Sequence, residues 1–129
     1  MACLDTTFLI DLLSGKEEIS LLMEELDKTE VSIAIASPSV MEIWLGAMLL
    51  GKESEKVKIN ELLSSFEIFP LDEKSAKEAA EIEADLWNSG KMIDIEDVMI
   101  AGIARIHGEK VVTRDQHFAQ ISGLKVLKY

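Results

Sequence analysis

Short apolar runs alternate with longer amphipathic stretches along this whole chain, and this alternation limits the fold more than any other feature. The runs that predict strands span residues 2–4, 31–35, 67–69, 110–113 and 124–127. The stretches with helical periodicity span residues 7–13, 17–28, 37–50, 54–65, 73–87, 95–107 and 116–120. Strands separated by helices favour an α/β fold with a mainly parallel sheet between two helical layers. The 129 residues fit one such α/β/α sandwich, a single domain over 1–129.

Residues typical of helix ends support these boundaries. Ser37 and Pro38 predict an N-cap followed by the first residue of a helix, and Asp72 is placed to cap the helix that follows it. Gly51 and Gly108 come directly after two expected helix ends, where glycine is common.

The charge balance restricts how this chain could bind nucleic acid. Lys and Arg number 13 against 24 Asp and Glu, a formal net charge of −11, which disfavours non-specific binding through a broad basic patch. A nuclease of this composition would need local cations, either a bound metal or a basic rim around one cleft. One cysteine, Cys3, cannot form an internal disulfide, and no signal peptide or apolar run of roughly 20 residues is visible. We therefore expect a soluble, cytoplasmic protein that does not enter a membrane.

Four acidic residues stand where a parallel sheet places its binding sites. Asp5 ends the first expected strand, and Asp115 follows the strand at 110–113. Glu42 lies about one turn into the helix after the second strand, and Asp97 opens the helix that leads into the strand at 110–113. Because the carboxyl ends of parallel strands meet at one edge, we expect these carboxylates to converge there.

Apolar surroundings distinguish two of these acids. Glu42 is the only ionisable residue between Glu30 and Lys52, and Asp97 precedes a run, 98–104, that is apolar on every face. A helix that is apolar all round is usually buried, and a buried carboxylate needs a cation or hydrogen bonds. Few basic residues are available, so a metal ion is the expected counter-charge.

Each acid also has a purely structural interpretation. Asp5 and Asp115 could cap the helices that follow them, and Glu42 could close a capping box with Ser39. Asp97, with its acidic neighbours, could stabilise a helix N-terminus through the helix dipole. Only the joint placement of the four favours an active site. His107 and His117 are interpreted as surface residues or caps, and Asp11 as a solvated helix position.

Four segments, in order, resemble the motifs of PIN-domain proteins. They are Leu4-Asp5-Thr6-Thr7-Phe8-Leu9-Ile10-Asp11-Leu12-Leu13, Ser37-Pro38-Ser39-Val40-Met41-Glu42-Ile43, Ile95-Glu96-Asp97-Val98-Met99-Ile100-Ala101-Gly102-Ile103-Ala104 and Val111-Val112-Thr113-Arg114-Asp115-Gln116-His117-Phe118. In its length, the chain most resembles the VapC-like toxins of toxin–antitoxin pairs. One departure is Gly102, which replaces a commoner alanine and is expected only to loosen packing.

The resemblance implies a metal-dependent endoribonuclease. It implies Mg²⁺ or Mn²⁺ as cofactor, RNA as substrate, a homodimer, and an antitoxin partner that blocks the acidic pocket. By motif match, Asp5 and Asp97 would be the principal metal ligands, with Glu42 and Asp115 completing the catalytic cluster.

Other residues are expected to assist the four acids. Thr6 and Thr113 could orient a water or an acid by hydrogen bonding, and Arg114, Arg105 and Lys110 could neutralise RNA phosphates. Three alternatives stay open: an aspartate-based phosphoryl-transfer enzyme, a catalytically silent PIN-like binding module, and an RNA-processing nuclease without an antitoxin.

Overall fold

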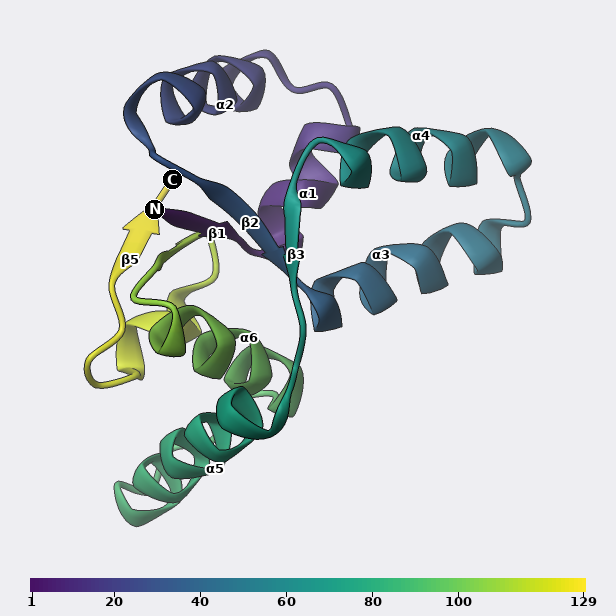
Figure 1. Cartoon of the computed structure of the whole chain (residues 1–129). Helices are drawn as coiled ribbons and strands as arrows, with labels where there is room; N and C mark the ends of the chain where they lie inside the picture. The colour runs from purple at the N-terminus through teal and green to yellow at the C-terminus, as the bar shows by residue number, and fades with distance from the viewer.

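The computed structural model describes all 129 residues and contains one five-stranded sheet (Figure 1). The strands are β1 (Ala2–Leu4), β2 (Ile33–Ala36), β3 (Glu67–Phe69), β4 (Lys110–Thr113) and β5 (Val126–Lys128). Their order is β3-β2-β1-β4-β5, and every neighbouring pair is parallel. The first strand is therefore central, beside a strand that the chain forms more than a hundred residues later.

Six α-helices and one 3₁₀-helix connect the strands. They are α1 (Thr6–Leu13), α2 (Glu17–Thr29), α3 (Ser37–Leu50), α4 (Glu53–Ser64), α5 (Glu73–Asn88), α6 (Ile95–Ile106) and η1 (Gln116–Gln120). None of these helices is long and apolar enough to cross a membrane. The predicted elements are all present, and the largest shifts are in β2 and β5, which begin two residues later than predicted. The start of β2 moves because Val31 is 93% exposed and lies outside the sheet.

The two faces of the sheet bury separate cores. Leu4, Ile35 and Val112 point to the face that α1 to α4 cover, where they pack with Phe8 and Leu9. Their chain neighbours Cys3, Ala36 and Val111 point to the opposite face, where they pack in the core formed by α5, α6 and η1. Successive strand residues point to opposite faces, so both sides of these strands are apolar. The predicted α/β/α sandwich is confirmed.

Helix capping agrees with the sequence in one case and not in another. The Asp72 side chain accepts a hydrogen bond from the Ser75 backbone, and the Ser75 hydroxyl accepts one from the Asp72 backbone, a reciprocal capping box at the start of α5. The predicted N-cap at Ser37 is wrong, because Ala36 holds that position and Ser37 is the first helical residue. The Ser37 hydroxyl accepts a hydrogen bond from the Leu71 backbone, which ties α3 to the segment after β3.

Gly102 tightens the packing of α6 against α5. A Cβ at this position would lie 2.8 Å from the Ala79 nitrogen and 2.9 Å from the Ser75 carbonyl oxygen. Both atoms belong to the backbone of α5 and cannot move aside separately. The expectation that glycine merely loosens packing here is therefore wrong: its missing side chain lets the two helices approach.

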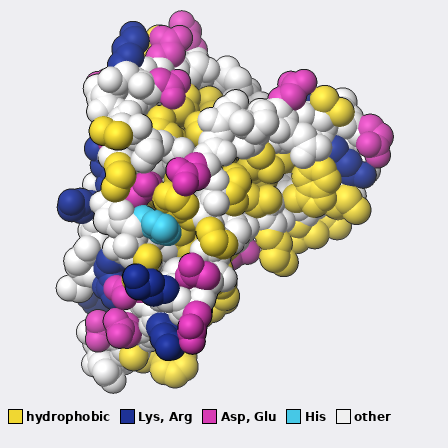
Figure 2. Space-filling model, viewed as in Figure 1, with side chains coloured by type: hydrophobic (Ala, Val, Ile, Leu, Met, Phe, Trp, Pro, Cys, Tyr) yellow, Lys and Arg dark blue, Asp and Glu magenta, His cyan; other side chains and the backbone are white.

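The apolar helix α3 is largely exposed. Met41, Leu45 and Leu49 are 68%, 51% and 80% exposed, and Figure 2 shows hydrophobic side chains gathered over this part of the molecule. Only one side of α3, including Ile43 and Ala47, packs in the core. The expectation that this helix is buried all round, and Glu42 with it, is therefore wrong. An exposed apolar surface of this kind is typical of an interaction site.

Candidate active site

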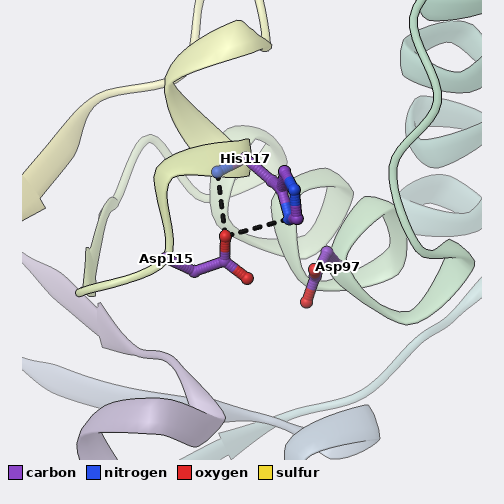
Figure 3. A group of neighbouring side chains, drawn as sticks. All are labelled: Asp97, Asp115 and His117. Atoms are coloured by element: carbon purple, nitrogen blue, oxygen red, sulfur yellow. Dashed lines mark hydrogen bonds and ion pairs between the residues drawn. The ribbon is translucent and has the colours of Figure 1, made fainter.

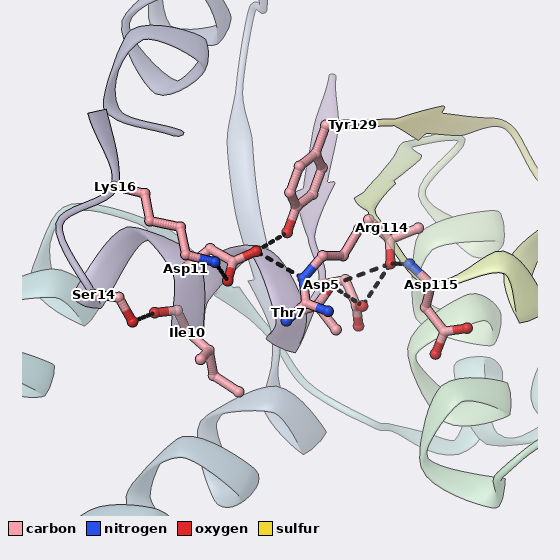
Figure 4. Close-up of polar contacts among 10 residues, drawn as sticks. Asp5, Thr7, Ile10, Asp11, Ser14, Lys16, Arg114, Asp115 and Tyr129 are labelled. Atoms are coloured by element: carbon pink, nitrogen blue, oxygen red, sulfur yellow. Dashed lines mark hydrogen bonds and ion pairs between the residues drawn. The ribbon is translucent and has the colours of Figure 1, made fainter. Parts of the chain in front are cut away.

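Asp5 lies at the carboxyl end of the central strand, in the N-cap position of α1. It is only 2% exposed, yet its side chain makes no capping hydrogen bond. Its Oδ2 accepts hydrogen bonds from the hydroxyls of Thr113, at 2.7 Å, and Thr7, at 2.9 Å (Figure 4). Its Oδ1 is buried with no hydrogen-bond partner. Burial raises the pKa of Asp5, and the two hydroxyls counteract this only in part.

Thr113 links three segments of the site. While its hydroxyl donates to Asp5 on one side, it accepts a 2.9 Å hydrogen bond from the backbone N–H of Asp115. The residue therefore fixes the loop after β4 relative to the end of β1. Thr113 lies where the sequence places it, in contact with a candidate metal ligand.

The Thr6 hydroxyl does not bond to the Asp5 carboxylate, and the Thr7 hydroxyl takes the supporting role expected of Thr6. The Thr6 side chain is buried and donates a 3.0 Å hydrogen bond to the Ser39 hydroxyl. This bond joins the first turn of α1 to the first turn of α3, the helix that carries Glu42. Thr6 thus contributes to the site by holding two helices together.

Asp97 of α6 and Asp115 of the loop after β4 lie close together, with His117 of η1 beside them (Figure 3). One potential ligand atom of each lies within 4.8 Å of the others. Asp115 also has the capping role considered above, because its Oδ1 accepts from the backbone N–H of His117. The same oxygen lies 3.0 Å from Nδ1 of His117. His117 was interpreted as a surface residue because the sequence gives no sign that η1 turns its ring toward Asp97.

The carboxylates of the pocket act on one another electrostatically. Partial burial, followed by the negative charges of Asp5 and Asp115 and then of Asp94 and Glu42, raises the pKa of Asp97 to about 7. The structure therefore brings Asp5, Asp97 and Asp115 into one electrostatic unit, and no basic residue is among the groups that dominate the pKa of Asp97.

Glu42 borders this unit instead of lying inside it. It is exposed on the second turn of α3, with Glu96 nearby. Burial and the adjacent charge of Glu42 raise the pKa of Glu96. Glu96 is thus an additional acidic neighbour that the sequence interpretation assigned only to helix stabilisation. Its position at the second residue of α6 offered no signal that it would approach α3.

Two of the three predicted RNA-contacting cations lie far from the carboxylates. Arg105 is near the opposite end of α6 from Asp97, where its Nε donates to Glu78 at 2.6 Å. Lys110 begins β4, at the other edge of the sheet, and pairs with Glu30. The expected contacts of these two residues with RNA at the carboxylates are therefore corrected. Arg114 follows β4 directly and is the cation beside the site.

Asp11 has a larger role than the solvated helix position assigned to it. It is 3% exposed and accepts hydrogen bonds from Lys16, Arg114 and Tyr129 (Figure 4). Burial alone would raise the pKa of Asp11, but these three donors outweigh it and lower the pKa to about 2. No local pattern around Asp11 reveals partners that lie up to 118 residues away.

The comparisons with known proteins agree with this geometry. The family model of the PIN domain matches residues 2–124. Ribonuclease VapC5 of Mycobacterium tuberculosis is 27% identical over 121 residues, which cover 93% of this chain and 87% of that protein. The tRNA(fMet)-specific endonuclease VapC of Salmonella typhimurium is 29% identical and covers 95% of this chain and 93% of that protein.

Solved structures share the same architecture. VapBC from Salmonella typhimurium, solved bound to DNA, aligns with a TM-score of 0.90 at 27% identity, over 98% of this chain and 96% of that one. VapBC2 from Rickettsia felis, bound to a promoter DNA fragment, has a TM-score of 0.92 at 24% identity, over 99% and 98%. At that identity the second likeness speaks for the fold alone. With the family model matching nearly its whole length, this chain belongs to the PIN domain family.

Proposed function

We propose that this protein is an endoribonuclease that hydrolyses RNA phosphodiester bonds with a divalent metal, and that it is the toxin of a VapBC-type toxin–antitoxin pair. One observation carries the proposal: the buried, unpartnered Oδ1 of Asp5 belongs to a cluster of acids in which burial and the neighbouring carboxylates raise the pKa of Asp97 to about 7. The curated relatives, whose names describe ribonucleases, support RNA as the substrate.

The residues present fit a divalent cation. Asp5 offers an oxygen that no protein group satisfies, and Asp97 and Asp115 offer carboxylates on the facing elements. Oxygen ligands suit Mg²⁺ and Mn²⁺, and the nearby His117 imidazole is compatible with Mn²⁺. Asp5, Asp97 and Asp115 would hold the ion, with Glu42 at the border of the pocket. Such an ion supplies Lewis-acid activation of the phosphate and lowers the pKa of water.

The protein's own contribution is to hold the ligands in place. Thr113 and Thr7 hold one oxygen of Asp5 by hydrogen bonds, which leaves the other without a protein partner. The Thr113 hydroxyl accepts a hydrogen bond from the Asp115 backbone and so holds the Asp115 carboxylate in position. Groups that orient ligands in this way typically change metal affinity or activity by 10- to 100-fold when removed.

The test is metal-dependent cleavage of a mixed RNA pool by the purified full chain. We expect cleavage with Mn²⁺ or Mg²⁺, none with EDTA, and none by Asp5→Asn under any condition. Glu78→Gln is the matched control, because Glu78 is an acid on α5 paired with Arg105 away from the pocket. Equal cleavage by the wild type and Asp5→Asn would refute the assignment of the site.

The exposed apolar side of α3 supports the proposed homodimer. Met41, Leu45, Met48 and Leu49 are each more than half exposed on this helix. We expect light scattering to give about twice the 14.3 kDa chain mass, and Leu45→Glu to shift the protein to a monomer. A monomeric wild type at micromolar concentration would contradict this assembly.

An antitoxin partner is supported by the solved relatives, which are toxin–antitoxin complexes from Salmonella typhimurium and Klebsiella pneumoniae among others. In this chain a groove of about 490 Å³ between α1, α3 and α4 leads to Glu42, with Ile10, Ile43 and Ile59 in its lining. We propose that an antitoxin segment fills this groove. Co-expression with the product of the neighbouring reading frame should suppress cleavage.

We also propose a cytoplasmic location for the protein, because its proposed substrate is RNA.

A further inference from the structure

Two cations share one buried carboxylate beside the acidic pocket. Lys16 Nζ lies 2.9 Å from Oδ1 of Asp11, and Arg114 Nε lies 2.8 Å from Oδ2 (Figure 4). The Tyr129 hydroxyl donates to Oδ2 at 2.9 Å, while its ring packs edge-on against Phe8 at 5.2 Å. This carboxylate of α1 is thus held by groups from the segment before α2 and from the ends of β4 and β5.

The charge count at Asp11 differs from that at the ion pairs of Glu78 and Glu30. Arg105 meets one carboxylate, that of Glu78. At the opposite edge of the sheet, Glu30 pairs with Lys110 and the Met1 ammonium, but the ammonium also lies near buried Glu109. At Asp11, one negative charge balances only one of two cations. A local excess of one positive charge remains in a chain whose net charge is −11.

Both cations stay accessible to a ligand. The side chains of Arg114 and Lys16 are 51% and 49% exposed, whereas that of Asp11 is 4% exposed. A guanidinium carries five N–H donors, and the bond to Asp11 uses the one at Nε. The remaining donors suit a phosphate, for which the planar guanidinium is a preferred partner.

The position relative to the carboxylates points to the ligand. Arg114 lies between Thr113, which holds Asp5, and Asp115 in the sequence. Figure 4 draws Lys16, Asp11 and Arg114 beside Asp5 and Asp115, so these two cations are the candidates to meet a phosphate that neighbours the one bound at the carboxylates. These cations also explain how so acidic a protein could bind RNA, since the neutralisation of phosphates by basic side chains provides much of the affinity for nucleic acid.

We propose that Arg114 and Lys16 form a subsite for a backbone phosphate next to the one cleaved, and that Asp11 is the positioning residue that holds both cations there. This inference rests on the proposed ribonuclease function. Tyr129 supports Asp11 through its hydroxyl and has no contact of its own with the RNA.

The test is steady-state cleavage of a fluorescent single-stranded RNA, selected from the pool that the wild type cleaves, at several salt concentrations. We expect Arg114→Ala to raise KM by about tenfold with a much smaller change in kcat. Its plot of log kcat/KM against log salt should be shallower by roughly 0.7, the value for one lost single-strand phosphate contact. Arg114→Lys should restore part of the affinity.

A double-mutant cycle identifies the role of Asp11. Asp11→Asn should raise KM and flatten the salt dependence as Arg114→Ala does, and should add little in the Arg114→Ala, Lys16→Ala background. Glu78→Gln, which alters the equivalent Nε pair of Arg105, is the matched control and should leave KM and the salt dependence unchanged. If Asp11→Asn does not fold, KM and the salt dependence of the two surface variants Arg114→Ala and Lys16→Ala still test the subsite. Tyr129→Phe, which removes one hydrogen bond to Asp11, then replaces Asp11→Asn in the cycle.

The outcomes separate this inference from the function on which it rests. Cleavage by the wild type, with unchanged KM and salt dependence in both Arg114→Ala and Lys16→Ala, would overturn the subsite alone. A fall in kcat at constant KM in Asp11→Asn would overturn its positioning role. Absence of metal-dependent cleavage by the wild type would overturn the proposed function and the subsite together.

Discussion

The Thr113 hydroxyl at the end of β4 donates a 2.7 Å hydrogen bond to Oδ2 of Asp5 at the end of β1. The two residues are 108 positions apart in the chain and lie next to each other because β1 and β4 are paired parallel strands. This bond satisfies Oδ2 of Asp5. The other oxygen, Oδ1, is buried without a hydrogen-bond partner and is available to bind a ligand.

Thr113→Val should weaken the site without removing any proposed ligand. Valine keeps the shape of threonine but cannot donate to Asp5 or accept from the Asp115 backbone. We expect a 10- to 100-fold loss of cleavage or Mn²⁺ affinity, as is typical for groups that orient metal ligands. Calorimetric titration with Mn²⁺ measures the affinity, and Thr113→Ser, which keeps the hydroxyl, should behave nearly as the wild type does. Wild-type affinity in Thr113→Val would contradict the orienting role.

Asp97→Asn should stabilise the metal-free protein at high pH while abolishing cleavage. The pKa of Asp97 rises from 3.8 to about 7 on folding, so the folded state retains a proton that the unfolded chain releases between these values. Stability therefore falls as pH increases from about 4 to 7. A tenfold change in proton affinity is about 1.4 kcal/mol, which sets an upper limit of roughly 4 kcal/mol.

Partial exposure of Asp97 to solvent reduces the effect, and we expect a gain of about 1–3 kcal/mol at pH 8. Urea unfolding in EDTA at pH 5 and pH 8 measures it. The wild type should lose stability between the two pH values, whereas Asp97→Asn should change less. Equal pH dependence in both proteins would show that Asp97 does not titrate in this range.

Mn²⁺ should bind more tightly at pH 8 than at pH 6. A carboxylate must be deprotonated to ligate a metal, and below pH of about 7 a proton competes for Asp97. We expect the affinity to fall by up to about tenfold per pH unit in this range. The increase in melting temperature with Mn²⁺ reports it, because a ligand specific to the folded state raises stability with its affinity. An increase independent of pH between 6 and 8 would exclude Asp97 as a ligand.

Gly102→Ala should destabilise the fold without changing the carboxylate pocket directly. The added Cβ would meet the α5 backbone at less than 3.0 Å, so the two helices must separate. Overpacking of this kind costs about 1–3 kcal/mol. Urea unfolding checks the loss, and Gly46→Ala is the control, since a Cβ at Gly46 meets nothing within 4 Å. Unchanged stability in Gly102→Ala would contradict the close approach of α5 and α6.

The sequence was sufficient for the fold because local patterns decide the elements. Short apolar runs, helical periodicity and the Asp72 cap all depend on near neighbours, and these predictions are confirmed. α3 was misjudged because its apolar composition indicates burial, while only one side of the helix, including Ile43 and Ala47, packs in the core. Gly102 was misjudged because its importance depends on the backbone of another helix.

The acidic site was predictable only in part for the same reason. Strand ends locate Asp5 and Asp115 at one edge, but the partners of a side chain depend on tertiary packing. Nothing near Asp11 in the sequence indicates Arg114 or Tyr129. Lys110 lies at the start of β4, whereas Arg114 directly follows its end, so only Arg114 is at the carboxylate edge of the sheet. Single-sequence reasoning therefore identifies the carboxylates more readily than the cations that accompany them.

The central place of β1 in the sheet has a consequence for the timing of activity during synthesis. The strand emerges first from the ribosome, yet the neighbour that supplies Thr113 and the loop of Asp115 emerges roughly a hundred residues later. A nascent chain therefore carries Asp5 and Glu42 without the acids that face them. The cluster of carboxylates can assemble only when nearly the entire chain has been made.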